Sequence, residues 1–205
     1  MLQKDEQFLE SYELFSKIKE LLNKASYVKI AVAFLTKYGY DELSANIEHF
    51  LKNKPTNKIE FIVGLSSYCI TEPDAFAALM KLQTFFSRQV KVKYYFNEGF
   101  HPKLFIFEHG EVTTVIVGSS NLTWQGLNIN VEANVVFTRP FKSDFIISVQ
   151  NYFKNLLDYA ASDLETAFRQ YDKMFKRFSN HQKGVIESSD EGKFSKTNLP
   201  PQFFE

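Results

Sequence analysis

The sequence predicts an α/β fold in which a mixed β-sheet is flanked by helices on both faces. In the first half of the chain, segments whose apolar residues recur every three or four positions alternate with short runs of β-branched and aromatic residues. In the second half, four strand candidates follow one another before a long helical segment. The composition, with 44% hydrophobic and 23% charged residues among 205, is that of one globular domain.

The first half of the chain is expected to form three helices and two strands. The helices are predicted over residues 7–24, 40–51 and 73–86, and the strands over residues 27–35 and 58–64. Phe8, Tyr12, Phe15, Ile18 and Leu22 form one apolar stripe along the first helix. The strands are rich in β-branched and aromatic residues, and the third helix has proline in its first turn.

The second half is expected to be dominated by strands and to end in a helix. The strands are predicted over residues 90–96, 103–107, 112–117 and 130–137, and the helix over residues 142–178. Four turn-forming residues join the second and third of these strands, which indicates a hairpin. A short helical turn is predicted over residues 122–127, with Asn121 or Ser120 as its N-cap.

Residues 1–180 are expected to form the folded domain, and residues 181–205, which are polar and contain paired prolines, a tail or linker. A single cysteine, Cys69, excludes an internal disulfide and a multi-cysteine zinc site, and we expect it to be a packing residue. No apolar run is long enough to cross a membrane, and residues 1–10 are too polar for a secretory signal. The expected compartment is the cytoplasm.

The charges balance overall, since 24 basic residues face 24 acidic ones. Two stretches, residues 81–103 and 169–183, are locally basic, each with five basic residues and one acidic residue. The first also contains Tyr94, Tyr95 and Phe100, so it could follow a nucleic-acid backbone. The alternative is that the charges form solvated faces and the aromatic rings pack in the core.

Three short pieces of sequence carry the chemistry. They are His101-Pro102-Lys103, Gly118-Ser119-Ser120-Asn121 and Glu132. Each alone is common enough to be structural, but together they suit a phosphodiester. His101 and Lys103 project to the same face of an extended strand, and Pro102 indicates the start of that strand. A neutral imidazole can attack phosphorus while an ammonium group neutralises charge on the phosphate oxygens, and neither step requires a metal ion or another cofactor.

The remaining residues are expected to bind the phosphate and to orient the histidine. Glu132 lies in a predicted strand of otherwise apolar residues, where a carboxylate needs a partner, and it could accept the second ring N–H of His101. Hydroxyl, amide and backbone donors of the Gly-Ser-Ser-Asn piece could hold the phosphate oxygens. The predicted catalytic residues are therefore His101, Lys103, Asn121 and Glu132, and the predicted phosphate-binding residues are Lys103, Ser119, Ser120 and Asn121.

This pattern resembles the motif of the phospholipase D superfamily, which is written H-x-K-x4-D and is followed by G-S-x-N. The resemblance covers about residues 101–137 and implies a phospholipase D-like fold. It also implies a phosphohistidine intermediate formed between two facing motifs, with Glu132 as the family's downstream glutamate. Glu108 stands where the motif has aspartate. That position is structural in the family, so we expect the change to be tolerated.

Because the chain shows only one such motif, we expect a homodimer with a shared active site, in which His101, Lys103 and Asn121 of both copies meet across a two-fold axis. Single-motif members of the superfamily are typically nucleases. The resemblance therefore implies a metal-independent endonuclease acting on DNA, such as the catalytic part of a restriction-type enzyme, with a recognition or helicase domain or a partner subunit to select the target.

Other functions remain open from the sequence. The chain could be a non-catalytic nucleic-acid-binding module with this fold, or a phosphodiesterase acting on a phospholipid or another small phosphodiester. His101 and His109, with Glu108 and Glu111 nearby, could bind a cation, but their spacing is not that of a recognised metal site. No membrane anchor is expected.

Overall fold

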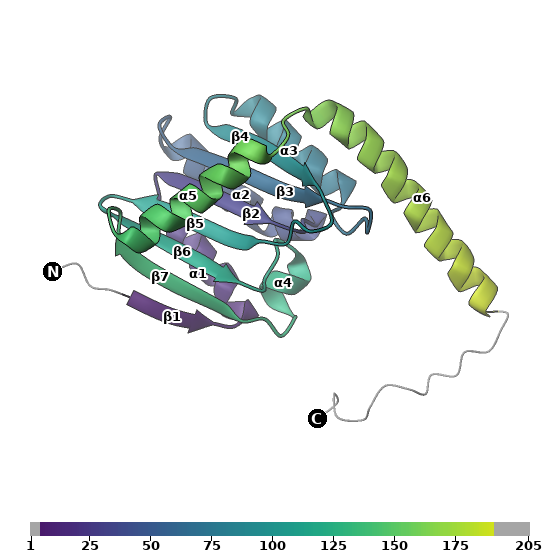
Figure 1. Ribbon diagram of the computed structural model, residues 1–205, viewed down its shortest axis with the longest axis horizontal. Helices are drawn as coiled ribbons and strands as arrows, with labels where there is room; N and C mark the ends of the chain where they lie inside the picture. Colours follow the sequence, from purple (N-terminus) through teal and green to yellow (C-terminus); the bar gives the residue numbers. More distant parts are fainter. Residues whose placement is uncertain (1–4, 191–205) are drawn as a thin grey trace, which may run out of the picture.

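Within residues 5–190, which the computed structural model describes (with side chains for residues 6–180), seven strands form a mixed sheet (Figure 1). The strands are β1 (Asp5–Leu9), β2 (Tyr27–Val32), β3 (Lys58–Leu65), β4 (Val90–Phe96), β5 (Lys103–His109), β6 (Val112–Gly118) and β7 (Asn134–Pro140). Their order across the sheet is β1-β7-β6-β5-β2-β3-β4. The three strands β2, β3 and β4 run parallel, and every other pairing is antiparallel.

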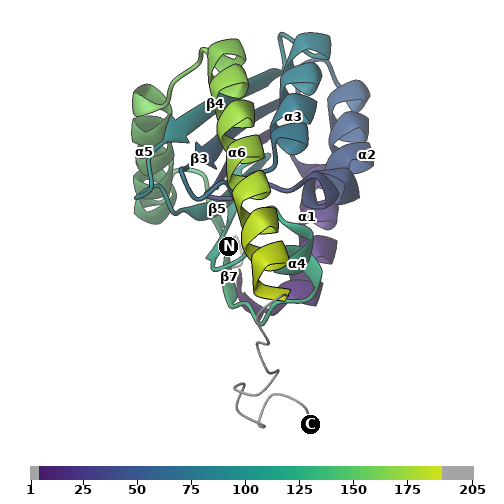
Figure 2. The same ribbon diagram turned by 90° about the vertical axis from the view of Figure 1, so that its right-hand side faces the viewer.

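The helices of this range cover the two faces of the sheet unequally (Figure 2). They are α1 (Ser11–Lys24), α2 (Lys37–Asn53), α3 (Pro73–Phe85), α4 (Trp124–Asn128), α5 (Asp144–Tyr159) and α6 (Leu164–Asp190). Only α5 lies on one face, and the other helices lie on the opposite face. The predicted mixed sheet with helices on both faces is therefore confirmed.

The central strands are buried on both faces, which explains their nearly continuous apolar sequences. Phe61 of β3 and Phe105 of β5 belong to the larger core under α1, α2, α3 and α6. Their neighbours in sequence, Ile62 and Ile106, point the other way, into a smaller core with Phe153 of α5. Side chains of a strand alternate between faces, so each of these strands contributes to both layers.

The prediction of a helix over residues 7–24 was wrong at its N-terminal end. Residues 5–9 form the edge strand β1, which pairs with β7, and the helix begins at Ser11. The Glu13 carboxylate accepts a hydrogen bond from the backbone N–H of Glu10 at 3.0 Å, which satisfies a free donor at the helix start. Phe8 and Tyr12, which the predicted stripe included, are exposed. Helical spacing of apolar residues therefore does not distinguish a helix from an edge strand when the side chains concerned are exposed to solvent.

The long helix predicted over residues 142–178 is two helices on opposite faces of the sheet. Between α5 and α6, Ala161 pairs with Tyr94 at the edge strand β4 through two backbone hydrogen bonds of 2.9 and 3.0 Å. The chain crosses from one face to the other at this point. Helix α6 continues to Asp190, through part of the predicted tail, and residues 191–205 lie outside the described residues.

Helix α2 approaches the loop before α4 so closely that only glycine fits at position 39. A Cβ atom there would lie 2.5 Å from the carbonyl oxygen of Leu122 and 2.6 Å from Cα of Thr123. Alanine in a helix is favoured over glycine by about 1 kcal/mol, but crowding in a packed core costs about 1–3 kcal/mol, and backbone cannot move aside as a side chain can.

We therefore expect Gly39→Ala to lower the free energy of unfolding by about 1 kcal/mol or more, because the clash outweighs the gain in helix propensity. Urea denaturation measures this change. Gly99→Ala is the matched control, because a Cβ atom there would meet only the Asn97 side chain, at 3.2 Å. A Gly39→Ala protein as stable as the wild type would show that the two segments are not packed in this way.

Candidate active site

Three segments that are distant in sequence meet at one edge of the sheet, where β2 ends, β5 begins and β6 ends. The backbone N–H of Ala33 donates to the carbonyl oxygen of Pro102 at 2.9 Å, which holds the end of β2 against the start of β5. Leu35 forms a bridge with Leu122, beyond the end of β6. Strand β2 is parallel to β3 on one side and antiparallel to β5 on the other. Such a change of direction at the carboxyl end of a parallel strand is a common place for ligands in α/β folds.

His101 and Lys103 lie together at the start of β5, as predicted. The Lys103 ammonium nitrogen lies 2.7 Å from Nδ1 and 3.0 Å from Nε2 of the His101 ring, and it donates to the His101 carbonyl oxygen at 3.0 Å. Lys103 is only 7% exposed, whereas His101 is an exposed residue. The imidazole is therefore accessible from solvent, with a buried positive charge beside it.

This arrangement favours a neutral imidazole. The pKa of His101 is lowered from its ordinary 6.5 by partial burial and then by the charge of Lys103. Burial also lowers the pKa of Lys103, and the negative charge of Glu132 opposes that effect. A neutral His101 ring has one nitrogen lone pair, which a nucleophile requires and which lies within hydrogen-bond distance of the Lys103 ammonium in this structure.

Asn121 contributes a carboxamide whose orientation is fixed from one side. Its Oδ1 atom accepts a hydrogen bond from the backbone N–H of Phe34 at 3.0 Å. Among the residues with described side chains, no hydrogen bond joins the Nδ2 group of Asn121 to a protein acceptor. Two N–H donors therefore remain for a ligand.

The two serines of the Gly-Ser-Ser-Asn piece are tied to the segment that leads into β7. The Ser119 hydroxyl accepts a hydrogen bond from the backbone N–H of Ala133 at 3.0 Å. Ser120 is fully buried, and its hydroxyl accepts from Nδ2 of the buried Asn134 at 2.9 Å. The Ser120 hydroxyl is therefore not available to a bound anion, and the backbone N–H of Ser120 donates to Oδ1 of Asn134 at 3.4 Å. The phosphate-binding roles of Ser119 and Ser120 stay predictions.

Glu132 does not occupy its predicted place. Strand β7 begins at Asn134, so Glu132 lies in the segment before the strand. Its carboxylate accepts a hydrogen bond from Nδ2 of Asn130 at 3.1 Å and not from the His101 ring. The predicted orienting hydrogen bond is therefore wrong for this structure. Glu132 still acts on the site through space, because its charge stabilises the protonated form of Lys103.

The prediction that Asn121 or Ser120 caps the helical turn after the Gly-Ser-Ser-Asn piece was wrong. Thr123 is the N-cap of α4, and its hydroxyl accepts from the backbone N–H of Gly126 at 3.0 Å. The N–H of Trp124 donates to the Thr36 hydroxyl at 3.4 Å. These bonds use donors of the turn for folding, so the turn is not a phosphate site of its own.

Other candidates from the sequence are structural. Glu108, at the motif's aspartate position, forms a 2.6 Å ion pair with Lys29 at the far end of β5. His109 lies at that same end, so it cannot share a cation with His101, and no group of three metal-ligating side chains occurs among the described residues. Cys69 is buried, and burial raises the pKa of its thiol, in keeping with a packing role.

A second His-x-Lys occurs at residues 181–183, within α6. No Gly-Ser-x-Asn follows it in the sequence. This pair therefore does not form a second copy of the site.

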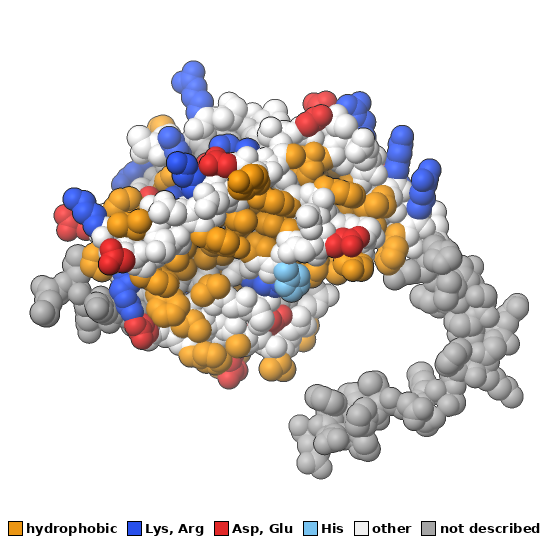
Figure 3. Space-filling model, in the orientation of Figure 1, with side chains coloured by type: hydrophobic (Ala, Val, Ile, Leu, Met, Phe, Trp, Pro, Cys, Tyr) orange, Lys and Arg blue, Asp and Glu red, His pale blue; other side chains and the backbone are white. Residues whose placement is uncertain are grey.

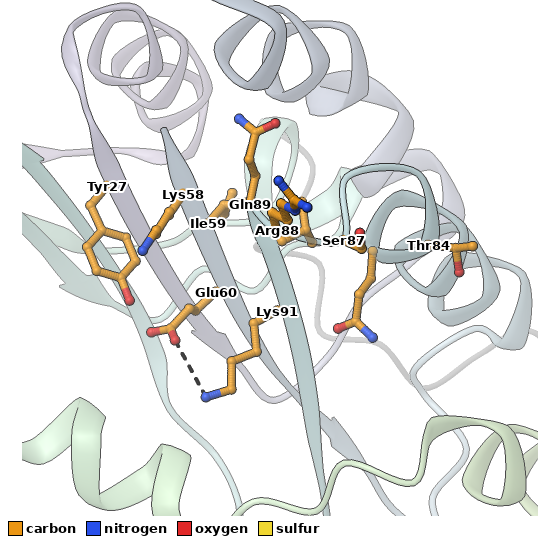
Figure 4. A pocket seen from close by; sticks show the side chains of 11 residues that line it. Tyr27, Lys58, Ile59, Glu60, Thr84, Ser87, Arg88, Gln89 and Lys91 are labelled. Carbon is orange, nitrogen blue, oxygen red and sulfur yellow. Dashed lines mark ion pairs between the residues drawn. The ribbon is translucent and has the colours of Figure 1, made fainter. Parts of the chain in front are cut away.

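The basic stretch over residues 81–103 does not form one continuous surface. Lys91 lies 3.8 Å from the Glu60 carboxylate in a hollow at the other end of the parallel strands (Figure 4). Lys93 donates to backbone carbonyl oxygens near the end of α5. Tyr95 stacks on Phe100 with ring centroids 4.4 Å apart. Tyr95 and Phe100 therefore pack on each other, and Lys91 and Lys93 point to different places.

Phe34 also contacts the site, although the sequence predicted it only as part of a buried strand over residues 27–35. In the structure Phe34 follows β2, and its ring centroid lies 5.6 Å from that of the His101 ring, edge to face. The Lys103 ammonium lies 5.7 Å from the same ring. The only signal in the sequence is an aromatic residue at the end of an apolar run, which is too common to indicate a site.

Comparison with known proteins places the whole arrangement in a recognised group. Residues 15–157 match the family model described as "Cardiolipin synthase, PLD-like domain". No curated protein matches the chain in sequence. No helix among residues 5–190 combines the length and the apolar character that crossing a bilayer requires.

Solved structures share the fold at low sequence identity. The phospholipase D family member Nuc from Salmonella typhimurium superposes with a TM-score of 0.61 at 16% identity, covering 78% of this chain and 97% of that one. NucT from Helicobacter pylori gives 0.56 at 15% identity, covering 78% and 99%. Phosphatidylserine synthase from Haemophilus influenzae gives 0.59 at 13% identity, covering 90% of this chain but only 46% of its own.

We expect Lys103→Met to raise the pKa of His101, because the positive charge beside the imidazole is removed while an apolar side chain of similar length keeps the ring partly buried. A proton NMR titration of the histidine side chains measures this change. Lys29→Met, at the other end of β5, is the control. An unchanged or lowered pKa in Lys103→Met would contradict the electrostatic coupling.

Proposed function

The chain belongs to the PLD-like domain family of the phospholipase D superfamily, and on this basis we propose that it is a metal-independent phosphodiesterase that hydrolyses DNA. The observation that supports the proposal most directly is the contact of His101 with Lys103 beside the free amide donors of Asn121. This site offers a nucleophile and positive or donor groups for phosphate oxygens. Phosphoryl transfer depends mainly on such positioning and charge stabilisation.

The proposed reaction has two steps and uses two copies of His101. In the first step, the neutral ring of one copy attacks phosphorus, so that a P–N bond forms while the bond to the leaving oxygen breaks. The two rings share one proton as a coupled pair, and the ring of the other copy, which holds this proton, gives it to that oxygen. In the second step, this now neutral ring takes a proton from water, the water oxygen attacks phosphorus, and the P–N bond breaks. Lys103 and Asn121 stabilise the charge on the phosphate oxygens in both steps.

The second histidine would come from a second copy of the chain, seated on the face that carries α5. A groove on this face is lined almost entirely by apolar residues and includes Pro102 and Lys103, so it borders the active site. Val117 and Tyr152, which also line the groove, are 42% and 51% exposed. Hydrophobic side chains gather over this face (Figure 3). An exposed apolar surface of this kind is typical of an interface.

DNA is favoured as the substrate because the single-motif members of the superfamily, which this chain resembles over residues 101–137, are typically nucleases. A phospholipid is the second candidate, because a phosphatidylserine synthase shares the fold and an apolar groove lies beside Lys103. We further propose that the chain is the catalytic part of a restriction-type enzyme in the cytoplasm, with target recognition supplied by another domain or a partner subunit.

We expect the wild-type protein to cleave plasmid DNA in the presence of EDTA, and His101→Ala to lose this activity, because the nucleophile and the proton donor are the same residue in the two copies. Gel electrophoresis of the plasmid measures cleavage. Parallel assays with bis(p-nitrophenyl) phosphate and with phosphatidylcholine vesicles identify the substrate class. Cleavage of none of the three substrates would instead support a binding module.

Mixing the two proteins tests whether both histidines act in one site. When equal amounts of wild type and His101→Ala are refolded together, a shared site leaves about one quarter of the wild-type activity, since only dimers with two intact copies work. Independent sites would leave about one half.

We expect Tyr152→Glu to give a folded but monomeric and inactive protein, because a charge placed in the apolar groove opposes burial against a second copy. Analytical ultracentrifugation measures the molecular mass, and circular dichroism verifies the fold. Tyr159→Glu is the matched control, since Tyr159 lies on the same helix but is 83% exposed and outside the groove. A dimeric, active Tyr152→Glu protein would contradict the proposed interface.

A further inference from the structure

The segment after β2 contacts three of the four predicted catalytic residues, His101, Lys103 and Asn121, although it carries no reactive side chain itself. Phe34 is its central residue. The backbone N–H of Phe34 donates to Oδ1 of Asn121, and its ring lies against both His101 and Lys103. No other described residue is joined to all three of these groups by a hydrogen bond or ring contact.

The backbone on both sides of Phe34 is held in place by hydrogen bonds. Before it, Ala33 donates to the carbonyl oxygen of Pro102 at 2.9 Å. After it, the N–H of Leu35 donates to the Thr71 hydroxyl at 3.2 Å, and the N–H of Thr36 donates to the carbonyl oxygen of Leu122 at 3.2 Å. Four successive N–H groups are therefore bound to three different parts of the chain, which fixes the position of the ring.

Thr71 provides a buried support behind this segment. Its hydroxyl donates to the carbonyl oxygen of Gly64 at 2.8 Å, and its own carbonyl oxygen accepts from the hydroxyl of Tyr171 at 2.8 Å. Thr71 and Tyr171 are each only 1% exposed. Because Tyr171 belongs to α6, the C-terminal helix takes part in holding the segment that faces the active site.

The aromatic ring has properties that an aliphatic side chain of similar size lacks. A ring face carries partial negative charge and attracts an ammonium group, here that of Lys103. The planes of the Phe34 and His101 rings meet at 78°, an arrangement that aromatic pairs prefer. The ring also covers the side of the imidazole that it contacts, and so adds to the burial that lowers the pKa of His101.

We propose that Phe34 is a positioning residue for the reaction: its backbone N–H aims the Asn121 carboxamide, and its ring holds the imidazole of His101 and the ammonium of Lys103 in register. This proposal rests on the proposed function for its effect on catalysis. Small displacements of reacting groups are costly, since a shift of about 1 Å can lower a rate about 100-fold.

Phe34→Leu should lower kcat about 10- to 100-fold and leave KM within about threefold, because substrate is still bound but the nucleophile is less well oriented. Phe34→Tyr keeps the ring and should retain kcat within about threefold of the wild type. Proton NMR titration of the full chain should show a higher pKa for His101 in Phe34→Leu, since less of the imidazole is covered. Phe34→Met is a second variant without an aromatic ring, for use if Phe34→Leu does not fold.

Phe86→Leu is the matched control, because Phe86 is also half-buried against the main core but lies at the end of α3, away from the site. It should lower stability without changing kcat or the pKa of His101. Equal losses of kcat in Phe34→Leu and Phe86→Leu, or an unchanged pKa of His101 in Phe34→Leu, would overturn the proposal. Absence of phosphodiesterase activity in the wild type would instead refute the proposed function, and the titration would still test the ring contact.

Discussion

The buried ammonium group of Lys103 is the constraint on which the rest of the site depends. An uncompensated charge in a protein interior is very costly, so a 7% exposed lysine requires partners that replace water. The structure supplies them from several directions: one ring nitrogen and the carbonyl oxygen of His101, the face of Phe34 and the distant charge of Glu132. The groups that solvate the ammonium are therefore the same ones that place the imidazole at the surface.

Meeting that requirement brings together segments that are far apart in sequence. Strand β5 supplies the histidine and the lysine, the end of β6 supplies Asn121, and the segment after β2 connects them. Close backbone contacts make this possible, such as the approach of α2 to Leu122 at Gly39. The catalytic groups are therefore held by main-chain geometry, which side-chain motion does not easily disturb.

Local sequence patterns were sufficient for the inner strands β2 to β6 and for the proximity of His101 to Lys103, and insufficient where a structure depends on a partner that is distant in sequence. The bounds of β4 and the hairpin of β5 and β6 follow from local composition, and strand alternation alone places His101 and Lys103 on one face. The partner of Glu132 could not be predicted, because both Asn130 and His101 could donate to its carboxylate, and only the structure shows that Asn130 does so. The break between α5 and α6 depends on the pairing of Ala161 with the edge strand β4, and helical periodicity in the sequence does not indicate such a pairing. Ser119 and Ser120 are adjacent and chemically identical, and only the fold decides which one is buried.

The unequal covering of the sheet has a practical consequence. Because α6 lies on the face opposite α5, an exposed side chain on it such as Arg177 offers an attachment point that leaves the α5 face and its groove unobstructed. A fluorophore, an affinity handle or a solid support joined to the molecule there would keep that groove free for a second copy, but it would stand near the reactive edge, because α6 passes in front of this edge of the sheet (Figure 2).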